Sequence, residues 1–154
     1  MTTLLVLLAV ILYCLVAFRD IQTREIPNSL ALCILVLGVV WAVGVRTVED
    51  AALSFAAALL SFALALPLFL KGYLGGGDAK LIPVSVCLVG YDEAFGFAIN
   101  MSLLGGALSL IILAGHLART RFRAVAGGTE TAIPPATVPY GVAIAGAAVA
   151  ALIQ

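Results

Sequence analysis

The chain has 154 residues, of which 64% are hydrophobic and 10% charged, and its mean hydropathy is +1.21. A soluble domain carries about 25% charged residues, so this composition excludes a soluble globular protein and indicates an integral membrane protein. The formal net charge is zero and no basic run is interleaved with aromatic residues, which argues against nucleic-acid binding. We expect one all-α transmembrane domain over residues 1–154, with no separate soluble domain.

Six apolar stretches bounded by charged or turn residues predict six transmembrane helices. The first stretch carries no side-chain cation at its start and is not followed by a small-x-small cleavage pattern. We therefore expect a retained helix rather than a secretory signal. The fourth corresponds to about 18 Å of helix, against a hydrocarbon core of about 30 Å. In chain order the stretches are Met1–Phe18, Ser29–Val45, Ala51–Leu70, Ala79–Gly90, Ala94–Leu117 and Thr137–Ile153.

The lysine and arginine residues favour six crossings over five. If the short fourth stretch does not cross, the eight cations divide evenly between the two sides; if it crosses, Arg46 alone is separated from the rest. Because cytoplasmic loops carry the excess of cations, we expect six helices with both termini outside the cytoplasm. The cations of the predicted cytoplasmic side are Arg19, Arg24, Lys71, Lys80, Arg119, Arg121 and Arg123.

Two aspartates lie beside breaks in the apolar pattern. Asp20 follows the first stretch, and Asp78 precedes the fourth. The predicted topology places both on the cytoplasmic side, where they can meet although they are far apart in sequence. Two adjacent carboxylates share one proton, and such a pair is the least that an aspartic protease needs for catalysis. Taken singly, each has a simpler explanation: Asp20 as a juxtamembrane charge and Asp78 as a helix N-cap.

Three consecutive glycines, Gly75, Gly76 and Gly77, come immediately before Asp78. They permit backbone conformations closed to other residues and allow a substrate peptide to approach closely, although a flexible turn is the simpler interpretation. A phosphate-binding loop is excluded because no Gly-Lys followed by Ser or Thr occurs at the required spacing.

Together these motifs resemble those of the type IV prepilin peptidases, membrane aspartic proteases with a G-x-G-D motif, and in particular their short form found with tight-adherence (Flp) pilus systems. The matching residues are Asp20 followed by Ile26-Pro27-Asn28, and then Gly75-x-Gly77-Asp78-x-Lys80-Leu81.

The resemblance implies that Asp20 and Asp78 are the catalytic carboxylates, with no metal or cofactor. It implies prepilin and pseudopilin precursors as substrates, cut after the glycine that ends a short basic leader, on the cytoplasmic side of the bacterial inner membrane. Membrane lipids are the other expected partners. The residues expected to shape the substrate-binding loops are Gly75, Gly76, Gly77, Lys80, Pro27 and Asn28.

Larger members of that family add a cytoplasmic region with paired Cys-x-x-Cys motifs and also methylate the new N-terminus. Cys14, Cys33 and Cys87 form no such pair, so we expect peptidase activity without methyltransferase activity. Two alternatives stay open: a non-catalytic helical subunit of a pilus or secretion assembly platform, and a small transporter. The transporter has less support, because no charged residue lies in the interior of the six stretches.

Overall fold

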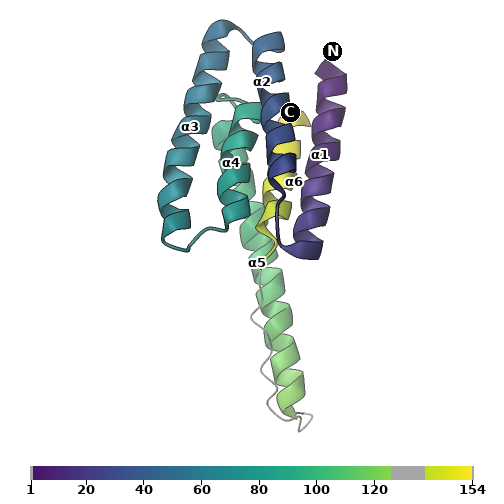
Figure 1. The fold of residues 1–154 in the computed structure, drawn as a ribbon. Coiled ribbons are helices and arrows are strands. Elements are labelled where there is room, and N and C mark those ends of the chain that lie inside the picture. The colour runs from purple at the N-terminus through teal and green to yellow at the C-terminus, as the bar shows by residue number, and fades with distance from the viewer. Residues whose placement is uncertain (1, 126–137, 154) are drawn as a thin grey trace.

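The computed structural model describes the backbone of residues 2–125 and 138–153, and the side chains of residues 3–119 and 138–153. This part of the chain forms six helices and no strand (Figure 1), which confirms the predicted all-α fold. The helices are α1 (Thr2–Thr23), α2 (Asn28–Val45), α3 (Val48–Leu70), α4 (Gly76–Val89), α5 (Ala94–Val125) and α6 (Tyr140–Ile153).

The helices run along roughly the same direction in one bundle, and α4 ends below the upper ends of α2 and α3 (Figure 1). The α1–α2 and α3–α4 connections lie together at the lower end of that view, where α6 also begins, and the α2–α3 connection lies at the upper end. Helix α4 occupies the middle, in contact with α2, α3 and α6, and α6 packs against α1 and α5. Helix α5 extends beyond the lower end of the bundle.

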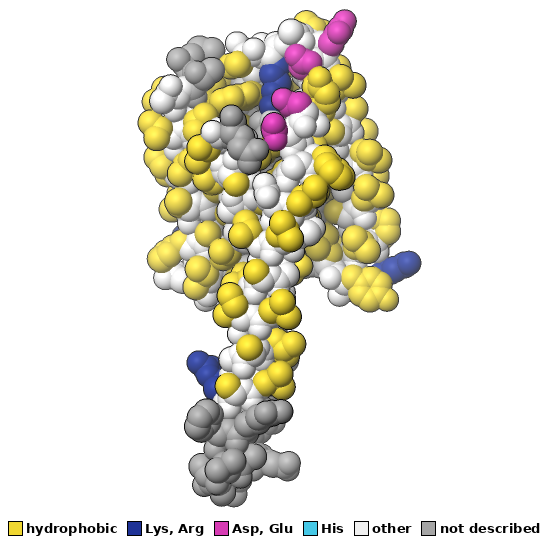
Figure 2. Space-filling model, turned by 180° about the vertical axis from the view of Figure 1, so that it is seen from behind, with side chains coloured by type: hydrophobic (Ala, Val, Ile, Leu, Met, Phe, Trp, Pro, Cys, Tyr) yellow, Lys and Arg dark blue, Asp and Glu magenta, His cyan; other side chains and the backbone are white. Residues whose placement is uncertain are grey.

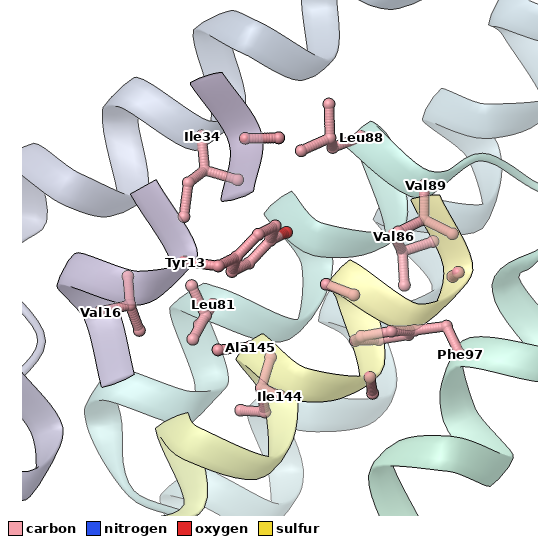
Figure 3. Close-up of a cluster of buried hydrophobic side chains, with 14 of the residues drawn as sticks. Tyr13, Val16, Ile34, Leu81, Val86, Leu88, Val89, Phe97, Ile144 and Ala145 are labelled. Carbon is pink, nitrogen blue, oxygen red and sulfur yellow. The ribbon is translucent and has the colours of Figure 1, made fainter. Parts of the chain in front are cut away.

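The core is formed where α1, α4 and α6 meet. Figure 3 shows the Tyr13 side chain of α1 pointing toward α4, with Leu81 beside it and Ile144 of α6 farther along the same cluster. Small buried residues of α6, including Ala147 and Ala148, allow the neighbouring helices to approach closely. Since lipid is as apolar as these side chains, close packing and dispersion contacts hold such helices together, rather than transfer from water.

The outer surface of the bundle is largely apolar. Figure 2 shows hydrophobic side chains over most of one face, with acidic side chains gathered at its upper end. Within the described residues, four helices are long and apolar enough to cross a membrane, namely α1, α2, α3 and α5, and at most 28% of the apolar window of each is buried inside the structure. Apolar side chains that face outward in this way belong in lipid, which is consistent with an integral membrane protein.

Helices α4 and α6 are shorter than a complete crossing. Each has 14 residues, about 21 Å of helix against a hydrocarbon core of about 30 Å. They are also the helices most enclosed by the others, each with seven buried residues. The prediction of six transmembrane helices is therefore supported for four of them, and the crossing of α4 and α6 stays a prediction.

Several helix ends differ from the prediction: α3 begins three residues before Ala51 and α5 continues eight residues past Leu117. Two further differences concern the candidate site. Helix α1 continues five residues past Phe18, so Asp20 lies inside its last turns and not in the loop after it. Helix α4 begins at Gly76, so Gly76 and Gly77 are helical and not part of a loop. Both helices extend past their predicted ends because polar side chains and glycines at a membrane edge interrupt the apolar pattern but not the helical backbone. The predicted helix start at Thr137 lies outside the described residues.

The upper end of α4 is capped by Arg46, which follows α2. Its guanidinium donates hydrogen bonds to the carbonyl oxygens of Leu88, at 3.3 Å, and Val89, and to Ser54 Oγ at 2.5 Å. The last carbonyls of a helix have no intrahelical partner and carry partial negative charge, so a cation there is doubly favourable. Arg46 thus lets α4 end inside the bundle, well short of the length of its neighbours.

Candidate active site

A cavity of about 780 Å³ lies at the end of the bundle where α1 ends and α4 begins. Both predicted catalytic residues, Asp20 and Asp78, line it, together with Gly75, Gly76 and Gly77. The fold therefore brings together five of the eight predicted site residues, from two segments that are separate in the sequence. The remaining three, Pro27, Asn28 and Lys80, are not among the residues that line the cavity.

Asp20 is the more deeply buried of the two carboxylates. Its side chain is 6% exposed, and none of the described residues forms a hydrogen bond with its Oδ2 atom. Helix α6 covers this atom: a methyl group added at Gly141 would lie 2.9 Å from it. The helix that holds Asp20 ends in a reversal at Arg24, with φ 56°, whose N–H donates a 3.2 Å hydrogen bond to the Asp20 carbonyl.

Asp78 is the third residue of α4 and is partly exposed to the cavity. Gly75, not Asp78, occupies the N-cap position of α4, so the simpler alternative, in which Asp78 only caps this helix, is wrong. The Asp78 carboxylate folds back toward that cap, because a methyl group added at Gly75 would lie 2.9 Å from Oδ2. Burial, and then the negative charge of Asp20, raise the pKa of Asp78 to about 6.

The glycines before Asp78 fit tightly against their surroundings. A methyl group at Gly77 would lie 3.1–3.2 Å from three carbons of Ile26, and one at Gly76 would lie 3.2 Å from the ring of Phe69. The missing side chains thus let the start of α4 pack directly on the α1–α2 connection, where Ile26 is buried. Close helix packing explains these two glycines without any flexibility of a loop.

Pro27, Asn28 and Lys80 lie outside the cavity, where Asn28 and Lys80 join the two segments. Pro27 is the N-cap residue of α2, in extended conformation, and Asn28 is the first residue of that helix. Lys80 Nζ donates a 2.9 Å hydrogen bond to Asn28 Oδ1, which ties α4 to the start of α2. Their predicted place in the substrate-binding loops is not tested by this geometry, which shows instead that Lys80 and Asn28 connect the segments carrying Asp20 and Asp78.

The remaining wall of the cavity was not anticipated from the sequence. One stripe of α3 supplies Ser61, Leu64, Ala65 and Leu68, at the i, i+3, i+4, i+7 spacing of a helix face, and α5 adds Met101. This helical spacing is visible in the sequence of α3. Because α3 is apolar on every side, however, the sequence does not distinguish this face from the faces that contact lipid. The other unpredicted lining residues are Arg24, Ile26, Tyr73, Leu74, Ile82, Val138 and Tyr140.

The arrangement is suited to acid–base chemistry on a neutral bond. A carboxyl group whose pKa lies near 6 can exchange its proton near neutral pH, and a second carboxylate in the same cavity can act as its partner. Among the described residues, no three His, Cys, Asp or Glu side chains are grouped as metal ligands.

Comparison with known proteins agrees with the motifs. The model of the type IV leader peptidase family matches residues 5–110, which is more than half of the chain. The matched segment contains Asp20, Asp78 and the whole of α4, whereas α6 lies outside it. No curated protein and no solved structure matches the chain.

Proposed function

The chain belongs to the type IV leader peptidase family, and on that basis we propose that it is an aspartic endopeptidase that cleaves the leader from Flp-type prepilins with Asp20 and Asp78. Its general role is that of a prepilin leader peptidase in a membrane. The proposal adds the carboxylate pair, the Flp-type substrates and the absence of methyltransferase activity.

One observation carries this proposal: two aspartates from separate helices line the same cavity, close enough for the charge of one to affect the protonation of the other. The charge of Asp20 contributes to the raised pKa of Asp78, which is the behaviour of carboxylates that share a proton. Two aspartates that served only as juxtamembrane charges would have no reason to turn toward one cavity.

The proposed reaction needs only these two side chains and a water molecule. The ionised carboxylate takes a proton from the water as its oxygen attacks the carbonyl carbon of the scissile peptide bond, and the protonated carboxyl donates to the carbonyl oxygen. When the C–N bond breaks, the first carboxyl gives its proton to the leaving nitrogen, and the second takes back a proton from a hydroxyl group of the tetrahedral intermediate as the C=O bond re-forms. Partial burial of the pair strengthens these interactions by excluding bulk water.

The shape of the cavity supports a substrate that is itself in the membrane. Its polar end holds Asp20 and Asp78, and its α3 side presents Leu64 and Leu68. A prepilin has a polar leader followed directly by a hydrophobic helix, so its scissile bond can reach the carboxylates while the start of the helix rests on the apolar side.

The orientation in the membrane is also part of the proposal. The cation bias favours a cytoplasmic position for the end that carries Asp20 and Asp78, with both chain termini outside the cytoplasm and the protein in the bacterial inner membrane. Helices α4 and α6 then complete six crossings, despite their length, because neighbouring helices surround them and local thinning of the bilayer accommodates them.

The test is co-expression with the pilin precursor of the same operon, with leader removal scored by gel shift and mass spectrometry. Wild type is compared with Asp20→Asn and Asp78→Asn at matched membrane levels. Asn keeps the shape of Asp but cannot exchange the proton. Asp92→Asn is the matched control, because it makes the same change at an exposed position in the α4–α5 connection.

We expect cleavage by wild type and by Asp92→Asn, and loss of cleavage in both site variants. Cleavage that persists in either site variant would remove that aspartate from the mechanism. A wild-type protein that cleaves no prepilin, although correctly inserted, would favour a non-catalytic role in pilus or secretion assembly.

A further inference from the structure

Two hydroxyl groups are buried deeper in the bundle than the two aspartates. The side chains of Tyr13 in α1 and Ser85 in α4 are both 0% exposed. Neither residue lines the cavity, so neither touches a substrate held there, and the proposed reaction uses neither of them. Because a polar group in an apolar interior is unfavourable unless it is paired, the presence of both hydroxyls calls for a separate explanation.

The two hydroxyls are close to each other. The Ser85 side chain lies within reach of the Tyr13 hydroxyl, although the two oxygens do not form a hydrogen bond of ordinary geometry, and neither has another partner among the described residues. Figure 3 shows the Tyr13 side chain pointing from α1 toward α4. Since a hydroxyl group rotates about its C–O bond to suit its neighbours, a small adjustment of either side chain completes a hydrogen bond between them.

Tyr13 and Ser85 occupy the same helix faces as the two aspartates. Tyr13 precedes Asp20 by seven residues, and Ser85 follows Asp78 by seven, which in each case is about two helical turns, or about 10 Å along the axis. Helix α1 runs toward the end of the bundle that holds the cavity, and α4 runs away from it (Figure 1). This antiparallel arrangement places the hydroxyl pair two turns above the carboxylate pair, between the same two helices.

Apolar side chains occupy the layer between the two polar pairs. Val16 of α1 and Leu81 of α4 are both 0% exposed and belong to the same core cluster as Tyr13. Val16 lies three residues after Tyr13, and Leu81 lies three residues after Asp78. Each helix thus presents a polar, an apolar and a polar residue at the spacing of one helix face, and the two series run in opposite directions through the core.

Side chains, rather than direct backbone packing, determine the separation of α1 and α4. Over the described residues these two helices approach each other less extensively than either approaches α2 or α6, both of which contact both of them. Tyr13 is among the largest side chains that the structure buries completely, and it points across this space. The cavity that holds Asp20 and Asp78 lies toward the other end of the same space.

A polar pair in an apolar interface is suited to fixing the register of two helices. Apolar contacts tolerate small sliding movements, whereas a single polar position in an apolar seam specifies the register at a cost in stability. In a membrane protein such interhelical hydrogen bonds contribute alongside close packing. A shift of α4 along α1 would separate the two hydroxyls and misalign the two carboxylates at the same time.

We propose that Tyr13 and Ser85 are positioning residues, whose hydroxyls pair between α1 and α4 and fix the register of these helices, and with it the alignment of Asp20 and Asp78. This inference rests on the proposed function. The hydroxyl pair takes no part in proton transfer to the substrate. Its effect on cleavage passes through the two helices that carry the carboxylates.

The first experiment compares Tyr13→Phe, Ser85→Ala and the double variant in prepilin cleavage and in thermal unfolding. Each single change leaves one buried hydroxyl without its partner, so we expect Tm to fall by about 2 °C or more. The double variant leaves no unpaired hydroxyl, and its Tm should return to the wild-type value. We expect kcat to be about 10-fold lower in all three variants, with KM within about 2-fold of wild type, because alignment is lost and no substrate contact is removed.

The double variant distinguishes positioning from stabilisation. If the pair only stabilised the fold, kcat would recover together with Tm, and that result would overturn the proposal. The matched control is Ser109→Ala, which also removes one serine hydroxyl from an apolar helix. Ser109 Oγ donates a 2.7 Å hydrogen bond to the Gly105 carbonyl of its own helix, α5. This control should therefore match wild type in kcat, and it joins no two helices.

The second experiment does not require activity. In a chain whose native cysteines are replaced by alanine, Asp20→Cys and Asp78→Cys are introduced together, and the rate of their oxidative cross-linking by copper phenanthroline is measured in membranes. We expect Tyr13→Phe and Ser85→Ala each to slow the cross-link several-fold, while Ser109→Ala leaves its rate unchanged. A rate that Tyr13→Phe and Ser85→Ala leave unchanged would overturn the positioning role, even if both variants slow cleavage.

Failure of the proposed function would appear separately. A wild-type protein that cleaves no prepilin, or a reference chain that forms no cross-link between positions 20 and 78, would count against the catalytic pair itself. In either case the thermal unfolding data still decide whether Tyr13 and Ser85 pair. A double variant whose Tm falls by the sum of the two single losses would show that the hydroxyls act independently, and would overturn the pairing.

Discussion

The Nζ atom of Lys80 donates a 2.9 Å hydrogen bond to Oδ1 of Asn28, a residue 52 positions earlier in the chain. The bond joins Lys80, the fifth residue of α4, to Asn28, the first residue of α2. Asp78 lies two residues before Lys80, and Asp20 lies on the helix that leads to Asn28. The two halves of the family motif are thus physically connected outside the cavity, and this connection helps to fix the separation of the two aspartates.

We expect Lys80→Met and Asn28→Ala each to slow prepilin cleavage by about 10-fold, because the two aspartates are then less well aligned. The free energy of unfolding should change little, since the bond is exposed and a hydrogen bond of this kind contributes about 0.5–1.5 kcal/mol at most. A double-mutant cycle on kcat is the measurement. The double variant should be no slower than the single ones, and strictly multiplicative losses would show that the two residues act independently.

The two helical glycines before Asp78 should differ in their tolerance of a methyl group. Gly77→Ala places it 3.1–3.2 Å from Cβ, Cγ1 and Cδ1 of buried Ile26, whereas Gly76→Ala meets only the ring edge of exposed Phe69. We expect Gly77→Ala to cost about 1–3 kcal/mol of stability by overpacking and to reduce cleavage, and Gly76→Ala to resemble wild type. Thermal unfolding in detergent and the cleavage assay check both. Equal effects of the two changes would contradict the packing explanation.

The raised pKa of Asp78 predicts a pH-dependent gain in stability for Asp78→Asn. A carboxyl that ionises near pH 6 in the folded protein, and near 3.8 in the unfolded chain, binds protons more tightly when folded. Wild-type stability should therefore fall as the pH rises from about 4 to about 6 and remain lower above that range. Asp78→Asn has no such loss. Its Tm should exceed that of wild type by about 2 °C or more at pH 7.5, and the difference should shrink below pH 4.

This gain is measured by thermal unfolding in detergent across the pH range, with Asp92→Asn as the matched control at an exposed position. A variant less stable than wild type at pH 7.5 would show that the Asp78 carboxylate is favourably solvated in the folded state, contrary to the burial that raises its pKa.

The cap on the upper end of α4 predicts a strong effect of Gly90→Ala. Gly90 has φ 106°, a conformation that side chains rarely adopt, and a methyl group there would collide with the Arg46 guanidinium. We expect a loss of about 1–3 kcal/mol from backbone strain alone, while Gly106→Ala, which adds a methyl group with nothing within 4 Å, should be neutral. Thermal unfolding checks the pair, and a neutral Gly90→Ala would show that Arg46 does not hold this end of the helix.

The order and polarity of the sequence determined the class of protein and the family to which it belongs. Apolar stretches long enough to cross a membrane can only be helices there, since every backbone group must be satisfied within the segment. The two aspartate motifs were also readable, because each lies in a short run of consecutive residues. Four of the predicted spans correspond to long apolar helices, and the family match supports the resemblance on which Asp20 and Asp78 were chosen.

Only the tertiary structure decided which other residues surround those aspartates. Gly141 and the α3 stripe that begins at Ser61 reach the site through contacts between helices distant in sequence. Side chains that face lipid and side chains that face the core are both apolar in this protein, so the periodicity that marks the buried face of a soluble helix carries little signal. In the sequence Arg46 is only an isolated cation. The fold shows that its guanidinium caps the last carbonyl groups of α4.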